Sequence, residues 1–363
     1  MCRKKIGAVL LAAAVLLAGC SRSPAYTGGT GSDSADRSEI PCDKEELFAM
    51  DTIITITCYG EKCKEAAEAA VAEVNRLDAL LSVGNPDSEV SVINANGSGP
   101  VSEDTRVIIR EALRVWEETG GAFDITIYPL MVEWGFTTES FHVPEPERIR
   151  ELLEHVDSGQ ICLDEEAGTV TIGEGQGIDL GGIAKGYTSD CLMEIFEEYE
   201  LDSAVISLGG NVQCYKRKPD GSLWICAIED PNHPLEDPNN PSTDDDFLGI
   251  VELDGQAAIT SGAYERNFTD EETGNVYHHI LDPATGYSAY AGLISVTVVS
   301  KSGILADTIS TACYVMGLDD SLAYWEDHKD EFDLIMMTDD NTVYVTEGMK
   351  NVFTTDYPLV VVS

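Results

Sequence analysis

Helical and extended sequence patterns do not alternate regularly along this chain, and this order constrains its fold more than any other feature. Apolar residues at helical spacing predict helices over 61–81, 103–118, 145–156 and 304–316, with a further helix ending near Glu200. Alternating apolar residues predict strands over 51–59, 169–172, 204–207, 223–228, 249–253 and 292–299. Parallel βαβ proteins alternate strand and helix, so we predict an α+β fold with mixed sheets and packed helices.

Three local features complete this prediction. A hairpin is expected from 334–337 and 342–346, an extended run from Asp124 to Leu130, and a solvated loop over 230–246. The length suits one large domain or two closely packed ones, and we place a single domain at residues 47–363.

The N-terminus has the pattern of a secreted lipoprotein. A basic start precedes an apolar run from Ile6 to Leu17, and Leu17-Ala18-Gly19-Cys20 follows. The apolar run is short for a membrane span, which needs about 20 residues. We therefore predict a signal peptide over 1–19, acylation of Cys20 and a flexible tether over 20–46. These features place the protein at the extracytoplasmic face of a bacterial membrane, anchored by lipid.

The charge balance excludes one class of partner. The formal net charge is −43, from 22 basic and 65 acidic residues. Nucleic-acid binding needs clustered Lys and Arg, so we expect no nucleic-acid partner. If the substrate carries phosphate, a metal ion is the expected intermediary. No CxxC motif is present, which argues against a zinc site.

A histidine pair, His278 and His279, leads into the turn sequence Asp282-Pro283-Ala284-Thr285-Gly286. Histidine titrates near neutral pH, and a stiff turn after a strand holds a reactive group well. One of these histidines is therefore a candidate acid, base or ligand.

Two other segments offer oxygen or backbone ligands. The run from Asp179 to Gly186 joins a Gly-rich loop to a helix start, and it either cradles an anion or metal or is a tight structural turn. Asp307 and Thr311 share one helical face. They are either hard ligands suited to Mg²⁺ or, for Asp307, a carboxylate interacting with amides at the start of its own helix.

Two further segments allow a functional or a structural interpretation. Phe123 and Trp134 follow a Gly-Gly break and either stack on a planar ligand or belong to the core. Ser261, with His279 and an aspartate, raises the alternative of a hydrolase triad, although no G-x-S-x-G motif is present.

Together these segments resemble the ApbE-like FAD:protein FMN transferase family, from about residue 47 to the C-terminus. Each motif is weak alone, but eight occur in order. They are Met50-Asp51-Thr52; Ser88-Glu89 with Asn94; Gly121-Ala122-Phe123-Asp124 with Pro129-Leu130 and Trp134-Gly135-Phe136; Asp179 to Tyr187; Leu208-Gly209-Gly210-Asn211; Thr260-Ser261-Gly262 with Tyr264-Glu265-Arg266; His279 to Pro283 with Thr285-Gly286; and Ala306-Asp307 with Ser310-Thr311-Ala312.

The resemblance implies a Mg²⁺-dependent transfer of the FMN half of FAD to a Thr or Ser hydroxyl of an acceptor protein, with release of AMP. Membrane-bound redox subunits are the acceptors it implies. It makes Asp307, Thr311 and the carbonyl of Gly182 metal ligands, with Ala184 as the alternative to Gly182. It also matches His279 to the family's catalytic histidine, which would accept the hydroxyl proton as general base or orient that hydroxyl. The positions matching FAD contacts are Met50, Ala122, Phe123, Asp124, Asp179, Lys185 and Ile280.

One departure from the family pattern bears on the reaction. Gly84 stands where many relatives carry a tyrosine, and a missing ring would admit water. An FAD pyrophosphatase that yields FMN and AMP is therefore one alternative. A flavin-binding lipoprotein without catalysis is another.

Overall fold

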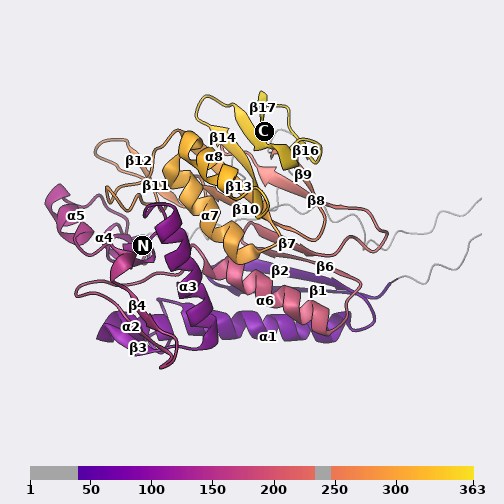
Figure 1. The fold of residues 1–363 in the computed structure, drawn as a ribbon, viewed down its shortest axis with the longest axis horizontal. Helices are drawn as coiled ribbons and strands as arrows, with labels where there is room; N and C mark the ends of the chain where they lie inside the picture. Colours follow the sequence, from indigo (N-terminus) through magenta and orange to yellow (C-terminus); the bar gives the residue numbers. More distant parts are fainter. Residues whose placement is uncertain (1–39, 234–246) are drawn as a thin grey trace, which may run out of the picture.

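The computed structural model describes residues 40–233 and 247–363, and its centre is a nine-stranded mixed sheet within these ranges (Figure 1). The expected signal peptide, Cys20 and most of the expected loop over 230–246 lie outside the described residues. In spatial order the strands of this sheet are β1 (Cys42–Ala49), β2 (Thr52–Tyr59), β6 (Ser203–Leu208), β7 (Asn211–Tyr215), β10 (Ala257–Gly262), β13 (Leu293–Ser300), β14 (Phe332–Thr338), β15 (Val343–Thr346) and β17 (Leu359–Val362).

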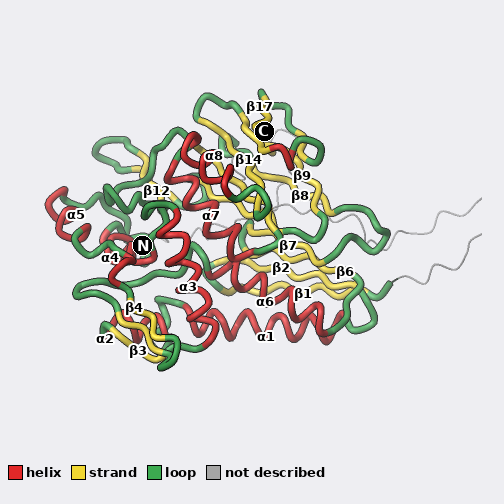
Figure 2. The backbone as a smooth tube through the Cα atoms, in the orientation of Figure 1, coloured by secondary structure: helices red, strands yellow, loops and turns green. Residues whose placement is uncertain are grey.

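Helices pack against the main sheet and extend beyond it (Figure 2). They are α1 (Cys63–Leu81), α2 (Glu89–Asn96), α3 (Glu103–Glu118), α4 (Tyr128–Glu133), α5 (Pro146–Leu153), α6 (Ala184–Glu198), α7 (Gly303–Met316) and α8 (Leu318–Asp327). Three small sheets complete the fold: β3 (Ser98–Pro100), β5 (Thr169–Thr171) and β4 (Cys162–Asp164); β16 (Phe353–Thr354), β9 (Phe247–Leu253) and β8 (Trp224–Glu229); and β11 (Asn267–Thr269) with β12 (Val276–His278).

The alternation of side chains along the strands divides the core between the two faces of the main sheet. Ile54 and Ile56 of β2 point toward α1 and α6, with which they form one buried cluster. Val212 of β7 and Ala258 of β10 point to the other face, where Trp224 of β8 covers them. The α+β prediction is confirmed, and the expected hairpin is the antiparallel pair β14–β15.

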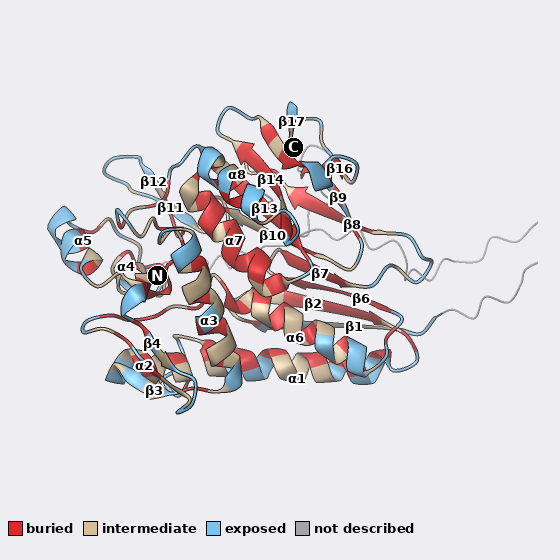
Figure 3. Cartoon of the chain, in the orientation of Figure 1, coloured by how far each residue is buried: buried red, intermediate tan, exposed pale blue. Residues whose placement is uncertain are grey.

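Helix α7 lies deepest among the helices that flank the sheet, and Figure 3 shows its predominantly buried surface. It packs against α6 on one side and β10 and β13 on another. Its N-cap is Ser302, whose hydroxyl accepts a hydrogen bond from the Leu305 amide. Because α7 is buried, the polar residues on it need partners inside the protein.

The folded region begins earlier than residue 47. Residues 42–46, which we assigned to the tether, belong to β1 and pair with β2 through the register Cys42↔Tyr59 to Ala49↔Thr52. The sequence pattern missed this strand because it contains Lys44-Glu45-Glu46. Charged side chains are tolerated on an edge strand, but in the sequence they resemble a solvated linker.

The extended run expected from Asp124 to Leu130 is wrong. The chain forms a 3₁₀ turn over Ile125–Ile127 and then α4, with Pro129 in its first turn. Proline suits that position because its missing amide is not needed there. The sequence patterns also missed α2, although it has a capping Ser88 and a left-handed Gly97 at its end.

Candidate active site

Several of the sequence motifs meet at one end of the main sheet. The β1–β2 turn at Met50-Asp51 and the β6–β7 turn at Gly209-Gly210 lie side by side, because Gly209 contacts Thr52 so closely that a Cβ there would overlap it. Gly209 has φ +57°, a conformation that glycine adopts without strain. The C-terminal end of strand β10 lies at this same end of the sheet.

Met50 and Asp51 adopt left-handed backbone conformations, with φ of 52° and 57°. This is the geometry of a type I′ hairpin turn, which usually contains Asn and Gly, and non-glycine residues in it cost of order 1 kcal/mol each. The Met50 amide donates to Asp78 Oδ1 at 3.1 Å, and the Met50 sulfur lies 3.6 Å from the hydroxyl oxygen of Thr188. Met50 is thus held in place from both α1 and α6.

Asp307 links α7 to the start of α6. Its carboxylate is buried and accepts a hydrogen bond from the Gly186 amide at 2.8 Å and from Asn211 Nδ2 at 2.9 Å. This excludes the interpretation in which Asp307 bonds to amides at the start of its own helix, since its backbone-amide partner belongs to α6. Each carboxylate oxygen keeps one further lone pair for another partner.

The Gly186 amide has an effect on Gly182. In a regular helix the Gly186 amide would donate to the Gly182 carbonyl, but here it donates to Asp307. No described residue donates a hydrogen bond to the Gly182 carbonyl. The Ala184 carbonyl, in contrast, accepts the hydroxyl of Thr188 at 2.8 Å. Between the two alternatives, Gly182 therefore has the free oxygen.

Thr311 and Phe123 lie beside Gly182. A Cβ built on Gly182 would lie 3.8 Å from Thr311 Oγ1 and 3.1 Å from the Phe123 ring. The structure thus brings together Gly182 and Thr311, two of the three expected metal ligands, and Asp307 is one helical turn from Thr311. Phe123 and Ile280 belong to the same buried cluster, against which Met50 packs.

Ser261 does not take part in a hydrolase triad. Its hydroxyl lies 2.9 Å from Ser310 Oγ and 3.3 Å from Thr311 Oγ1. Within the described ranges no hydrogen bond joins Ser261 to His279. Its position supports the hydroxyl of Thr311 instead.

The side chain of Asp124 holds a loop of the site in place. Its carboxylate is buried and accepts hydrogen bonds from the amide and hydroxyl of Thr126 and from the amide and hydroxyl of Ser158. Three of these bonds reach Oδ1 and one reaches Oδ2, and together they fix the loop that contains Ala122 and Phe123.

Asp179 stands one loop away, before the Gly-rich turn. Its amide donates to the Ile125 carbonyl, and its Oδ1 accepts from the Gly181 amide at 2.7 Å. Burial raises the pKa of the Asp179 carboxyl, while the nearby charges of Arg266 and Lys185 act in the opposite direction. Lys185 thus lies within electrostatic reach of Asp179.

His279 is neutral, and its tautomer is fixed by its neighbours. Its backbone amide and its Nδ1 both point to the carbonyl of Arg266, at 3.0 and 3.2 Å. A carbonyl accepts only, so Nδ1 carries the proton and Nε2 keeps its lone pair. Burial, then the neighbouring His278 and the charges of Arg266 and Lys185, lowers the pKa of His279 to about 3. The free Nε2 is the atom that can accept a proton.

His278 points the other way. Its ring is buried between Tyr290 and Tyr314, and Nε2 donates to the Ala289 carbonyl at 3.0 Å. Burial lowers the pKa of His278 to about 4. This environment agrees with the absence of a sequence-based role for His278.

The turn after His279 is stiff, as expected. Asp282 accepts hydrogen bonds from the Ala284 amide and the Thr285 hydroxyl, and the Gly286 amide donates to its carbonyl at 2.8 Å. Trp134 Nε1 donates to the Gly286 carbonyl at 2.9 Å from a fully buried position. Trp134 is therefore a core residue that fixes the turn.

Glu265 is a site residue to which the sequence patterns gave no role. Burial, assisted by the charges of Glu229 and Asp307, raises the pKa of its carboxyl to about 8, and Lys185 opposes this shift. The only signal in the sequence is its place in the Tyr264-Glu265-Arg266 motif. Glu265 lines a small pocket with Gly210 and Thr260.

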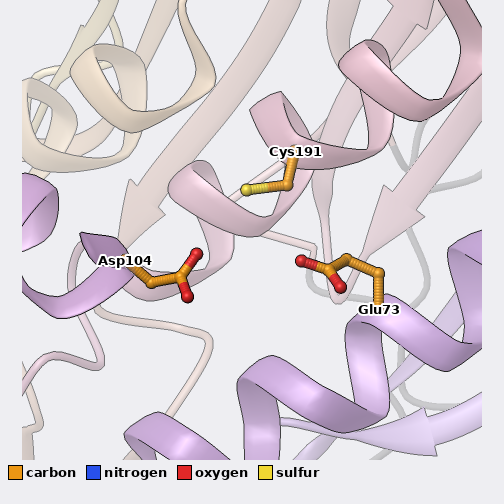
Figure 4. Close-up of side chains that lie close together, drawn as sticks. All are labelled: Glu73, Asp104 and Cys191. Carbon is orange, nitrogen blue, oxygen red and sulfur yellow. The ribbon is translucent and has the colours of Figure 1, made fainter. Parts of the chain in front are cut away.

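A second acidic group lies away from this site, between α1, α3 and α6. Figure 4 shows Glu73, Asp104 and Cys191 around a common space. Arg76 already donates to both carboxylates, at 2.6 to 3.1 Å. Burial raises the pKa of Cys191 to about 12, so its thiol stays protonated. We assign this group to an ion-pair network.

The comparisons with known proteins agree with the motifs. The model of the ApbE family matches residues 50–336. The FAD:protein FMN transferase of Treponema pallidum is 31% identical over 299 residues, which cover 76% of this chain and 79% of the relative. The same-named enzyme of Salmonella typhimurium is 30% identical over 321 residues, with coverage of 85% and 86%.

Solved structures share the fold. The ApbE protein of Thermotoga maritima superposes with a TM-score of 0.77 at 32% identity, covering 86% of this chain and 99% of that protein. The apo form of the flavinyl transferase ApbE of Pseudomonas stutzeri gives a TM-score of 0.72 at 27% identity, with coverage of 89% and 96%. On the matched region, the ordered motifs and the shared fold, this chain belongs to the ApbE family.

Proposed function

We propose that this protein transfers the FMN part of FAD to a Thr or Ser hydroxyl of an acceptor protein and releases AMP, with Mg²⁺ as its cofactor. The names of relatives that match over most of the chain support the reaction. One observation carries the proposal for the site. Asp307, Thr311 and the free carbonyl of Gly182 form a set of oxygens at the start of α6, beside Phe123.

These oxygens fit Mg²⁺ by their chemistry. A carboxylate, a hydroxyl and a backbone carbonyl are hard ligands, and magnesium takes few protein ligands together with substrate phosphates. When bound, the ion would neutralise charge on the pyrophosphate. Asn211 and the Gly186 amide hold the Asp307 carboxylate in one orientation, which is the support that a ligand needs.

His279 supplies the base. The acceptor hydroxyl attacks the phosphorus on the FMN side of the pyrophosphate, the bond from that phosphorus to the bridging oxygen breaks, and AMP leaves with that oxygen. The hydroxyl proton moves to Nε2 of His279, whose Nδ1 proton stays with the Arg266 carbonyl. Lys185 offers a point charge for phosphate, and Phe123 a ring for contact with FAD.

The proposed location rests on the N-terminal sequence. A lipid on Cys20 and a tether would hold the enzyme at the extracytoplasmic face of a bacterial membrane, where membrane redox subunits would be reachable acceptors. Among the described residues, none of the helices has the length and apolar character to cross a membrane.

Hydrolysis of FAD is the competing reaction, and Gly84 favours it. This residue is exposed, and a Cβ there would meet only the Ser82 hydroxyl, at 3.5 Å. The loop thus leaves open the space where many relatives carry a tyrosine. Water entering there would compete with the acceptor hydroxyl.

Incubation of the protein with FAD, Mg²⁺ and a purified acceptor subunit tests the proposal. Covalent flavin fluorescence on the denatured acceptor, with equimolar AMP, is the expected result. Free FMN and AMP without labelled acceptor would identify a pyrophosphatase. Unchanged FAD that remains bound would identify a flavin-binding protein. An acceptor in which the target Thr is replaced by Val serves as the control.

A further inference from the structure

Among the described residues, the guanidinium of Arg266 has no acidic partner, although the protein is rich in carboxylates. The other arginines in the described ranges form ion pairs with Asp or Glu: Arg76, Arg106, Arg110, Arg114, Arg148, Arg150 and Arg217. No described carboxylate lies within ion-pair distance of Arg266, and no described residue accepts a hydrogen bond from its guanidinium. An arginine without an acidic partner is unusual in a chain with 65 acidic residues and 22 basic ones.

The backbone fixes Arg266 next to His279. Strands β11 and β12 pair with the register Asn267↔His278, which sets Arg266 opposite His279. The Arg266 carbonyl accepts the two hydrogen bonds from His279, and the Asn267 side chain donates to the carbonyls of Ala263 and Tyr264, which closes the turn before it. The backbone of Arg266 is therefore fixed to both the backbone and the ring of the proposed base.

The charge of Arg266 lies within electrostatic reach of the same groups as the charge of Lys185. Both charges act on Asp179 and on His279, and Arg266 is partly buried. Two cations near the same groups, neither of which forms an ion pair with a described carboxylate, match a ligand with several anionic oxygens. Guanidinium binds phosphate through two parallel hydrogen bonds, which an ammonium group does not do.

We propose that Arg266 binds the pyrophosphate of FAD and stabilises the negative charge on the FMN-side phosphoryl group while it passes to the acceptor hydroxyl. This inference rests on the proposed function and adds a phosphate-binding residue to it. During transfer, charge develops on the equatorial oxygens of the moving group and on the departing AMP. A guanidinium placed there acts mainly in the transition state, and arginines in this role contribute about 10³- to 10⁵-fold in other phosphoryl-transfer enzymes.

Two substitutions and one matched control test this role. Arg266→Gln removes the charge, Arg266→Lys keeps it without the bidentate geometry, and Arg217→Gln removes an exposed arginine that pairs with Asp254. We expect Arg266→Gln to lower kcat/KM for FAD by at least about 100-fold and to weaken FAD binding by about 10-fold. We expect Arg266→Lys to recover part of kcat and Arg217→Gln to match the wild type.

Chemical rescue separates a phosphate contact from a structural role. In Arg266→Gly, added guanidinium should restore part of kcat, and it should leave the wild type unchanged. AMP binding, measured by calorimetry, should weaken in Arg266→Gln along with FAD binding. If Arg266→Gln keeps kcat/KM within about threefold of the wild type, or if all three Arg266 variants lose activity without rescue and with unchanged FAD and AMP affinity, the assignment is wrong.

Failure of the proposed function gives a different result. In that case the wild type and Arg217→Gln would both leave the acceptor unlabelled. FAD and AMP titrations then decide the role of Arg266 alone, since weaker binding by Arg266→Gln supports it and equal binding overturns it. A melting temperature within about 2 °C of the wild type would show that Arg266→Gln folds.

Discussion

At the scale of single residues, one backbone amide connects two parts of the site. The Gly186 amide donates to Asp307 and leaves the Gly182 carbonyl without a donor among the described residues. One hydrogen bond thus orients the Asp307 carboxylate and also leaves the Gly182 carbonyl free. The sequence indicated both residues by resemblance, but it did not show this connection.

Replacing Asp307 should abolish Mg²⁺-dependent turnover. Asp307→Ala removes the carboxylate and leaves Asn211 and the Gly186 amide unpaired in the interior, so we also expect a loss of about 2–3 kcal/mol of stability. Thr311→Val replaces the hydroxyl by a methyl group and keeps the shape of the side chain. It should raise the Mg²⁺ concentration needed for half-maximal activity. Steady-state assays over a Mg²⁺ series measure both effects. Full activity of Asp307→Ala would disprove the metal assignment.

Replacing His279 should separate chemistry from binding. His279→Ala should lower kcat by about 10²- to 10⁴-fold, as loss of a general base does, with little change in FAD affinity. Because the pKa of His279 is lowered to about 3, its protonation should not reduce the rate between pH 7 and 5. Rapid-mixing kinetics and FAD titration measure these quantities. An equal loss of binding and rate would make His279 a binding residue.

Gly84 should influence how FMN is shared between acceptor and water. Its φ lies outside the left-handed region and its surroundings are open, so a larger residue fits without strain. We expect Gly84→Tyr to lower the ratio of free FMN to acceptor-bound FMN by several-fold, whereas Gly84→Ala should leave it near the wild-type value. Chromatography of the products measures the ratio. An unchanged ratio in Gly84→Tyr would mean that water enters elsewhere.

At the scale of secondary-structure elements, the contact between α6 and α7 determines the geometry of the site. The two helices meet through Gly186 and Gly303, where the Gly186 Cα lies against the Gly303 carbonyl. A Cβ on Gly186 would also lie 2.5 Å from the Cβ of Asp307. This close approach explains why the motif Ala184-Lys185-Gly186 ends in glycine.

A side chain at Gly186 should therefore push α7 away from α6 and displace Asp307. We expect Gly186→Ala to cost about 3 kcal/mol, the upper part of the range for overpacking, and to weaken Mg²⁺ binding because Asp307 is displaced. Denaturant unfolding and calorimetry provide the two measurements. Gly84→Ala, at an exposed glycine, should be neutral in both. Wild-type stability of Gly186→Ala would show that the helices separate easily.

At the scale of the whole molecule, the main sheet carries the site at one end and begins with β1. The Met50-Asp51 turn lies between β1 and β2, so the edge strand is directly connected to the site. Leu47 and Ala49 contribute to the cluster beneath α1. The edge strand is therefore part of the catalytic domain.

Truncation tests where this domain begins. A fragment of residues 40–363 should melt within about 2 °C of the full mature chain and transfer FMN in solution. A fragment of residues 50–363 lacks β1 and exposes the edge of β2, so we expect a loss of several kcal/mol and little activity. Thermal unfolding and the transfer assay compare the two. Equal behaviour would make β1 dispensable and would restore the boundary at residue 47.

Much of the fold was predictable because its signals are local. The amphipathic patterns of α1 and α3, the β14–β15 hairpin and the order of helices and strands all appear in short windows of sequence. Strand β1 was missed because an edge strand has one partner and tolerates charge, and α4 because Pro129 resembles a break until the turn before it is known.

The sequence by itself determined the family and the class of fold, and it named the candidate site residues, since motifs and periodicity are properties of neighbours along the chain. Only the tertiary structure decided which atoms are free. It left the Gly182 carbonyl and His279 Nε2 without a hydrogen-bond donor among the described residues. It used the Asp124 carboxylate to hold the loop at Phe123, and it brought the backbone of Arg266 beside His279 with no described carboxylate as the partner of its guanidinium. These outcomes depend on hydrogen bonds between residues far apart in the chain, and local sequence patterns do not encode such pairs.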